Sequence, residues 1–230
     1  MKTDPVLVSH STQTGNGSHG FSEPAYCKQV ADRVFGILAR HLVNAFQIDP
    51  AGDFYDHFNL AKLLGAKWSM VIHTNASTSN ADTWQVKNSG PVVYCYDAED
   101  ATRESTIYAY KVAAGLAVIW GKPCPVLTHR FKELTVPGCS SVYPELGYHD
   151  NPADQEFLLN NWEKFAILLA SVQLEMLGIE YDSADLSPAE PVLIYQVQAG
   201  AFKNLAYAEN MVTALAAAGF PGAYIRRVEK

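Results

Sequence analysis

Six short apolar runs, each of strand length, limit the folds open to this 230-residue chain. The runs are "PVLVS", "AFQID", "SMVIH", "GPVVYCY", "CPVLT" and "SSVYP", and amphipathic segments separate several of them. Strand-like runs that alternate with helical patterns are typical of α/β proteins. The sequence therefore predicts an α/β fold with an open, mostly parallel, twisted sheet flanked by helices.

The segments between the runs predict four helices. The first begins near Ser22 to Pro24, because Ser, Glu and Pro all favour a helix N-terminus. Apolar residues at every fourth position form its expected buried stripe: Val30, Val34, Leu38 and Leu42. The other three helices are expected over residues 56–66, 100–120 and 153–178. They should cover the faces of the sheet.

The chain is expected to divide into a main domain over residues 1–180, a linker over 181–191 and a small unit over 192–230. The linker reads "YDSADLSPAEP", which is polar and contains proline. After it, "VLIYQVQAG", "AYAENMVTALAAAGF" and "GAYIRRV" predict a βαβ unit. Such a unit buries little surface alone, so we expect it to pack on the main domain or to pair with a second copy in a homodimer.

Composition excludes several classes of partner. The net charge of −7 comes without a basic cluster, which argues against nucleic acid as a partner. No apolar stretch is long enough to span a membrane, and no secretory signal is expected, so we expect synthesis in the cytoplasm. The four cysteines form no CxxC pair, which favours reduced, packed thiols over disulfides or metal ligands.

Three polar residues come at the ends of predicted strands, namely His10, His73 and Glu145. In an open α/β sheet, ligands collect at the carboxyl ends of the strands. Glu23 joins them if the glycine-rich loop before it folds the start of the first helix across the same edge. Two histidines and a carboxylate form a common catalytic zinc set that leaves a fourth position for water. The competing interpretation is that each histidine is an ordinary hydrogen-bonded residue.

Other polar residues offer alternatives. His19 is the rival to His10 because it lies in the same loop, although no strand holds it in place. Asn75 is expected to shape the turn after His73 by bonding the backbone. Four further histidines are expected to be surface or cap residues: His41, His57, His129 and His149. Tyr148 and Arg130 could line a substrate groove, or could simply be exposed.

The stretch "IHTNAS" at residues 72–77 resembles the H-x-N-A signature of zinc-dependent N-acetylmuramoyl-L-alanine amidases of the Amidase_3 type. The resemblance covers about residues 5–178, and its other motifs follow in order. It implies that Zn²⁺ is held by His10, Glu23 and His73, and that Glu145, in "VYPELGYHDN", is the catalytic glutamate. The chain departs from the family pattern at one motif, since it has "SHST" where the family commonly has "GHGG". In this respect the chain resembles the clostridial and phage-type members of the family.

The C-terminal stretch "YQVQAGAFKNLAYAENMVTALAAAGFPGAYI" resembles one repeat of a SPOR domain, a module that binds peptidoglycan. A complete SPOR domain has two βαβ halves, whereas this chain has one. The resemblance implies that two chains each contribute a half to one sheet, or that the half docks on its own catalytic domain.

Together the two resemblances imply a peptidoglycan amidase. Zinc would polarise the carbonyl of the muramoyl-alanine amide, and Glu145 would take the proton of the attacking water and deliver it to the leaving amine. A zinc deacetylase, a carboxypeptidase and a non-catalytic wall-binding protein are the alternatives. We expect an endolysin or autolysin that reaches the wall through a holin or after lysis.

Overall fold

The computed structural model describes residues 3–11, 19–47, 54–77 and 83–182, together with the single residues 209, 212 and 213. The chain forms two compact units, Met1–Asp182 and Ser183–Lys230. The predicted SPOR-like unit and all of the predicted linker beyond residue 182 therefore lie outside the described residues, apart from those three positions.

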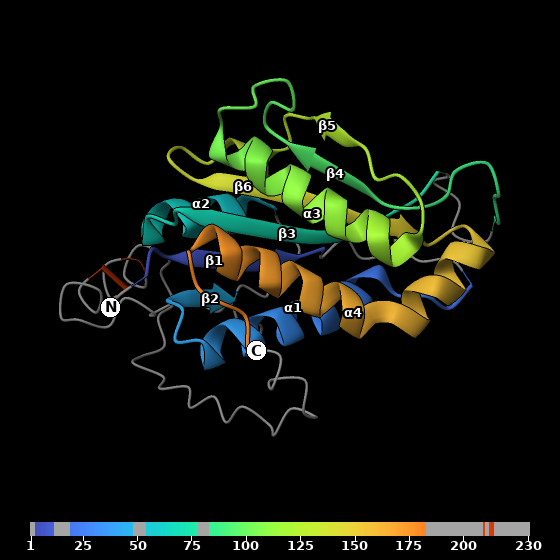
Figure 1. The fold of residues 1–230 in the computed structure, drawn as a ribbon, viewed down its shortest axis with the longest axis horizontal. Coiled ribbons are helices and arrows are strands. Elements are labelled where there is room, and N and C mark those ends of the chain that lie inside the picture. The colour runs from blue at the N-terminus through green and yellow to red at the C-terminus, as the bar shows by residue number, and fades with distance from the viewer. Residues whose placement is uncertain are drawn as a thin grey trace. The chain divides into compact units, whose positions relative to one another are not determined.

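The first unit is built on a six-stranded sheet (Figure 1), and its strands are β1 (Val6–His10), β2 (Ala45–Gln47), β3 (Trp68–Asn75), β4 (Val92–Cys95), β5 (Val126–Thr128) and β6 (Ser140–Tyr148). The strand order is β2-β1-β3-β6-β4-β5. All neighbours run parallel except β4 and β6, which are antiparallel. The predicted mostly parallel α/β sheet is confirmed, and each apolar run supplies one strand.

The helices are α1 (Glu23–Arg40), α2 (Phe54–Leu64), α3 (Glu104–Trp120) and α4 (Pro152–Met176), with one turn of 3-10 helix, η1 (Lys132–Thr135). All four predicted helices are confirmed, but α3 begins four residues later than expected. The Asp100 carboxylate accepts hydrogen bonds from the backbone N–H and the hydroxyl of Thr102, at 3.0 and 2.6 Å. Such local side-chain bonds compete with the helix, so they hold this segment in a turn.

The buried stripe of α1 is shorter than predicted. Val30, Val34 and Leu38 are fully buried, as expected, whereas Leu42 is 85% exposed. The helix ends at Arg40, and Leu42 has a φ of 58°, so its side chain leaves the stripe in the turn that follows. The prediction for Leu42 was wrong because the apolar periodicity continues two residues beyond the helix.

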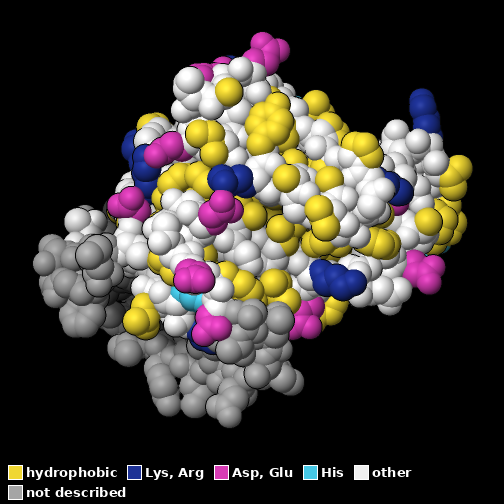
Figure 2. Space-filling view, in the orientation of Figure 1, with side chains coloured by type: hydrophobic (Ala, Val, Ile, Leu, Met, Phe, Trp, Pro, Cys, Tyr) yellow, Lys and Arg dark blue, Asp and Glu magenta, His cyan; other side chains and the backbone are white. Residues whose placement is uncertain are grey.

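Helices α1, α3 and α4 pack on one face of the sheet and form the main core with it, while α2 and η1 lie against the other face (Figure 1). Figure 2 shows apolar side chains scattered over the molecular surface on the side of α3 and α4. On α3, the side chains of Ile107, Tyr110 and Val118 are exposed. Isolated apolar side chains of this kind are ordinary on a folded surface.

All four cysteines are free, and Cys27 and Cys95 are buried, which agrees with the predicted packed thiols. Among the described residues, the search for an apolar helix of membrane-spanning length finds no candidate.

Candidate active site

The four residues singled out from the sequence are all buried in the first unit. His10 is the last residue of β1, Glu23 is the first residue of α1, His73 lies in β3 and Glu145 lies in β6. Their exposed fractions are 4, 2, 7 and 8%. The strands β3 and β6 continue past His73 and Glu145, so these two residues lie within the strands, close to their carboxyl ends.

Glu23 is fixed at the mouth of α1 by local helix signals. Ser22 is the N-cap, and its hydroxyl accepts a hydrogen bond from the backbone N–H of Ala25 at 3.4 Å. Pro24 follows in the first turn, where its missing N–H costs no helical bond. These signals decide where the helix starts, and thereby which residue projects from its first turn.

Glu23 and His73 contact each other. His73 Nδ1 lies 3.1 Å from Glu23 Oε1, and the backbone N–H of Thr74 donates to the same oxygen at 3.1 Å. Burial raises the pKa of Glu23, but the hydrogen bond and charge of His73 and the Thr74 N–H together outweigh burial. The pKa of Glu23 is therefore below its ordinary value, and this carboxylate stays ionised although it is buried.

Glu145 lies directly opposite His73 in the register of β3 and β6. Its Oε2 is buried, and among the described residues no group donates a hydrogen bond to it. Burial, with a smaller contribution from the negative charge of Glu23, raises the pKa of Glu145 well above its ordinary value. Two buried carboxyl groups with pKa values displaced in opposite directions are a hallmark of acid–base sites.

His10 is held differently. Its Nδ1 lies 2.8 Å from the carbonyl oxygen of Ser11, and because a carbonyl can only accept, Nδ1 is the protonated nitrogen. In the register of β1 and β3, His10 lies opposite Ile72, one position before His73. Successive side chains of a strand leave it in opposite senses, so the pleat directs His10 and His73 apart. In the described part of the chain, no three His, Cys, Asp or Glu side chains are arranged to hold a metal ion.

His149 is part of this neighbourhood, although the sequence analysis assigned it to the surface or a cap. The prediction was wrong, because the His149 side chain is buried and its Nδ1 lies 2.9 Å from Thr74 Oγ1. Its backbone N–H donates to the carbonyl of Asn75 at 2.9 Å. Burial lowers its pKa, although Glu23 and Asp150 act in the opposite direction. Its place in "VYPELGYHDN", four residues after Glu145, was the available signal.

Three other histidines differ in how far they are buried. His19 is exposed and stacks on Trp84 with ring centroids 3.8 Å apart, whereas the ligand candidates are buried. His41 is the C-cap of α1, as expected. His57 was expected to be a surface or cap residue and is instead buried in α2, where its Nε2 lies 2.9 Å from Ser69 Oγ. The sequence did not predict the burial of His57, because the amphipathic pattern of the 11-residue helix α2 is too short to show which side faces the sheet.

The predicted role of Asn75 is confirmed. Its side-chain Oδ1 accepts a hydrogen bond from the backbone N–H of Ala76 at 2.8 Å. This bond shapes the turn that follows His73.

No family model matches the chain, and no curated protein matches it either. Solved structures do. The chain has the fold of N-acetylmuramoyl-L-alanine amidases. The amidase from Clostridium difficile 630 matches with a TM-score of 0.65 at 16% identity, over 77% of this chain and 98% of that one.

Two further solved structures have the same fold. The catalytic domain of CwlV from Bacillus (Paenibacillus) polymyxa matches with a TM-score of 0.66 at 18% identity, over 78% of this chain and all (100%) of that one. The catalytic domain of an endolysin that targets Clostridia difficile matches with a TM-score of 0.60 at 15% identity, over 78% of this chain and 99% of that one. At such identities the likeness shows the fold.

Proposed function

We propose that the chain hydrolyses the N-acetylmuramoyl-L-alanine amide of peptidoglycan in a zinc-dependent reaction. The observation that carries the proposal is the buried Glu145 carboxyl, with Oε2 unpartnered among the described residues, opposite the His73–Glu23 pair. The amidase fold of the solved structures supports the same substrate class. The fold and the side chains together support an amide of the cell wall as the substrate.

The donor set suits zinc, which binds imidazole nitrogen and carboxylate oxygen. Glu23 stays ionised and contacts His73, which supports these two side chains as a pair of ligands. The Nδ1–H of His10 bonds a backbone carbonyl, which leaves the lone pair on Nε2, the arrangement usual for a metal-binding histidine. We propose His10, Glu23 and His73 as the ligands, with a change in the orientation of His10 or His73 on metal binding.

Zinc bound at these residues would polarise the scissile carbonyl and lower the pKa of the attacking water. The chain itself contributes Glu145. At Oε2 this carboxylate accepts the proton of the water and then donates it to the amide nitrogen, which is a poor leaving group until it is protonated. Burial raises the pKa of Glu145, so this carboxyl holds a transferred proton more firmly than an ordinary carboxyl does, which suits a group that carries a proton from water to the leaving amine.

The test combines metal analysis with product analysis. Purified protein should contain about one zinc per chain, and digested cell walls should release stem peptides with a free N-terminal alanine. Glu23→Ala and His73→Ala should each lose the metal and the activity, while His19→Ala, at the exposed rival histidine, should keep both. Zinc without new amino termini would favour a deacetylase or a wall-binding protein, and full activity in a chelated protein would contradict the zinc assignment.

We also propose that residues 192–230 bind peptidoglycan as a SPOR-like half, and that two chains can pair through them. The division of the chain after Asp182 supports a separate C-terminal unit. Light scattering on the full chain should show a concentration-dependent homodimer, and a chain ending at Asp182 should remain monomeric. A strict monomer at all concentrations would contradict the pairing. We propose that the protein is an endolysin or autolysin, which reaches the cell wall through a holin or after lysis of the cell.

A further inference from the structure

A continuous stack of aromatic rings leads away from His73. The ring centroids of His73 and Tyr143 lie 4.3 Å apart, those of Tyr143 and Phe131 lie 4.7 Å apart, and those of Phe131 and His129 lie 3.6 Å apart. Tyr94 meets the Phe131 and His129 rings edge-on, at 5.4 and 5.6 Å. The stack therefore connects the buried site to His129, which is exposed.

Arg130 stands at the outer end of this aromatic track. Its guanidinium lies 3.6 Å from the centroid of the Tyr96 ring, so cation–π stacking holds it in place. The residue is exposed, and among the described residues it has no carboxylate partner at ion-pair distance. A guanidinium that stacks on a ring and has no carboxylate partner among the described residues can pair with an external anion.

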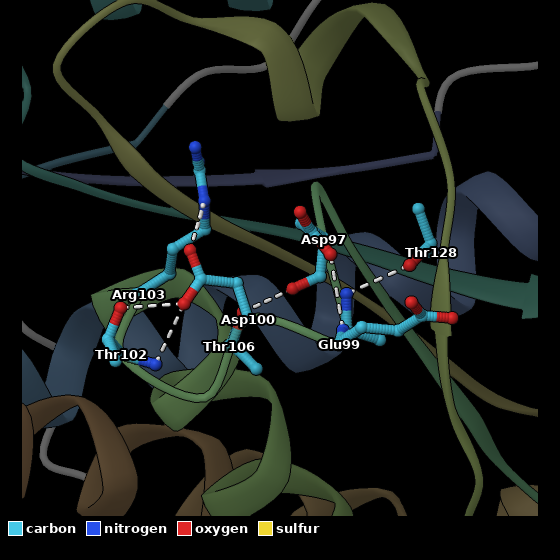
Figure 3. Close-up of polar contacts among 8 residues, drawn as sticks. Asp97, Glu99, Asp100, Thr102, Arg103, Thr106 and Thr128 are labelled. Atoms are coloured by element: carbon cyan, nitrogen blue, oxygen red, sulfur yellow. Dashed lines mark hydrogen bonds and ion pairs between the residues drawn. The ribbon is translucent and has the colours of Figure 1, made fainter.

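Arg103 provides an internal comparison. It approaches the same Tyr96 ring at 5.0 Å, but its Nε donates to Asp100 Oδ2 at 3.2 Å. Figure 3 shows this pair in the turn before α3. The charge of Arg103 is therefore compensated by Asp100, whereas in the part of the chain that the structure describes no carboxylate lies at ion-pair distance from Arg130.

We propose that the aromatic track is the floor of the substrate groove and that Arg130 binds a carboxylate of the peptide carried by the substrate. A planar guanidinium pairs with a carboxylate through two parallel hydrogen bonds. The three ring-to-ring steps from His73 to His129 match the reach of roughly three to four residues of extended peptide. The inference rests on the proposed function, since it places the peptide of the cleaved amide along this track.

The experiment compares Arg130→Gln with Arg103→Gln in the full-length, zinc-loaded protein. Two soluble muropeptides serve as substrates: one with free peptide carboxylates, and one in which these are carboxamides. We expect Arg130→Gln to raise KM about tenfold on the carboxylate substrate, with kcat within about twofold of the unchanged protein. On the carboxamide substrate the two proteins should have similar KM values, and Arg103→Gln should resemble the unchanged protein on both.

Binding of the isolated stem peptide, measured by calorimetry, separates this inference from the proposed function. Arg130→Gln should weaken that binding about tenfold, whether or not the amide is cleaved. An unchanged KM and affinity in Arg130→Gln would overturn the inference, as would an equal loss on the carboxamide substrate or in Arg103→Gln. A protein that binds the peptide but releases no new amino terminus would contradict the proposed function alone. A phosphate-bearing wall polymer is another anion that Arg130 could bind. The soluble substrates contain no such polymer, so it cannot cause the difference in KM between the two proteins.

Discussion

His73 Nδ1 lies 3.1 Å from Glu23 Oε1, although the two residues are fifty positions apart in the chain. The contact joins the first turn of α1 to the carboxyl end of β3. Glu145 stands opposite His73 on the neighbouring strand β6. Three elements therefore bring two ionisable partners and a separate buried carboxyl to one edge of the sheet.

Replacement of Glu145 by Gln should remove the proposed proton acceptor and leave the proposed ligands intact. We expect activity to fall at least about 100-fold, because positioned acid–base groups commonly contribute that much, with the zinc content unchanged. The measurement is the rate of release of new amino termini from cell walls. Glu156→Gln, at an exposed carboxyl of α4, is the matched control and should retain full activity. Substantial activity in Glu145→Gln would show that another residue takes the proton.

The same substitution should stabilise the metal-free protein at neutral pH. Burial and the charge of Glu23 raise the pKa of Glu145, so the unfolded chain ionises at lower pH than the folded one. Above the ordinary pKa of 4.5, folding stability falls by about 1.4 kcal/mol per pH unit until the folded pKa is reached.

Glutamine does not ionise and avoids this loss. In urea unfolding of chelated protein, Glu145→Gln should exceed the unchanged protein in stability at pH 7, with a smaller difference at pH 4. The same difference at both pH values would mean that ionisation of Glu145 is not the cause.

His57 should make the protein sensitive to acid. Burial, with a smaller contribution from His73, lowers the pKa of His57 from 6.5 to about 3. The unfolded chain therefore binds a proton at this residue before the folded chain does, and stability is lost as the pH falls from 6.5 towards 3. Unfolding measured between pH 7 and 4 should show a shallower decline in His57→Gln than in His41→Gln, where the substituted histidine caps α1. Equal slopes would contradict the prediction.

Gly115 allows α3 to approach α4. A Cβ at this position would overlap Leu168 Cδ1, and its distance to Leu168 Cγ would be 2.9 Å. Gly115→Ala should therefore destabilise the protein by about 1–3 kcal/mol, since overpacking outweighs the gain in helix propensity. Denaturant unfolding measures the change. In the Leu168→Ala background the same substitution should cost much less, and an equal cost in both backgrounds would show that Leu168 is not the obstacle.

The strands and helices were predictable because their signals are local. Apolar runs flanked by turn residues marked all six strands, and the Ser22–Glu23–Pro24 sequence marked the start of α1. The same locality explains the errors. The apolar period continued to Leu42 although the helix had ended, and the turn bonds of Asp100 delayed α3. A pattern of residue types does not contain these competing contacts.

The sequence by itself determined the fold class and the set of chemical groups at the site, because strand and helix periodicity and the order of the motifs are written along the chain. Only the tertiary structure decided which groups meet. Strand register placed Glu145 beside His73 and His10 beside Ile72. Packing buried His57 and His149, for which the sequence pattern predicts surface or cap positions. Register and burial depend on partners far away in the chain, and for that reason local pattern could not reveal them.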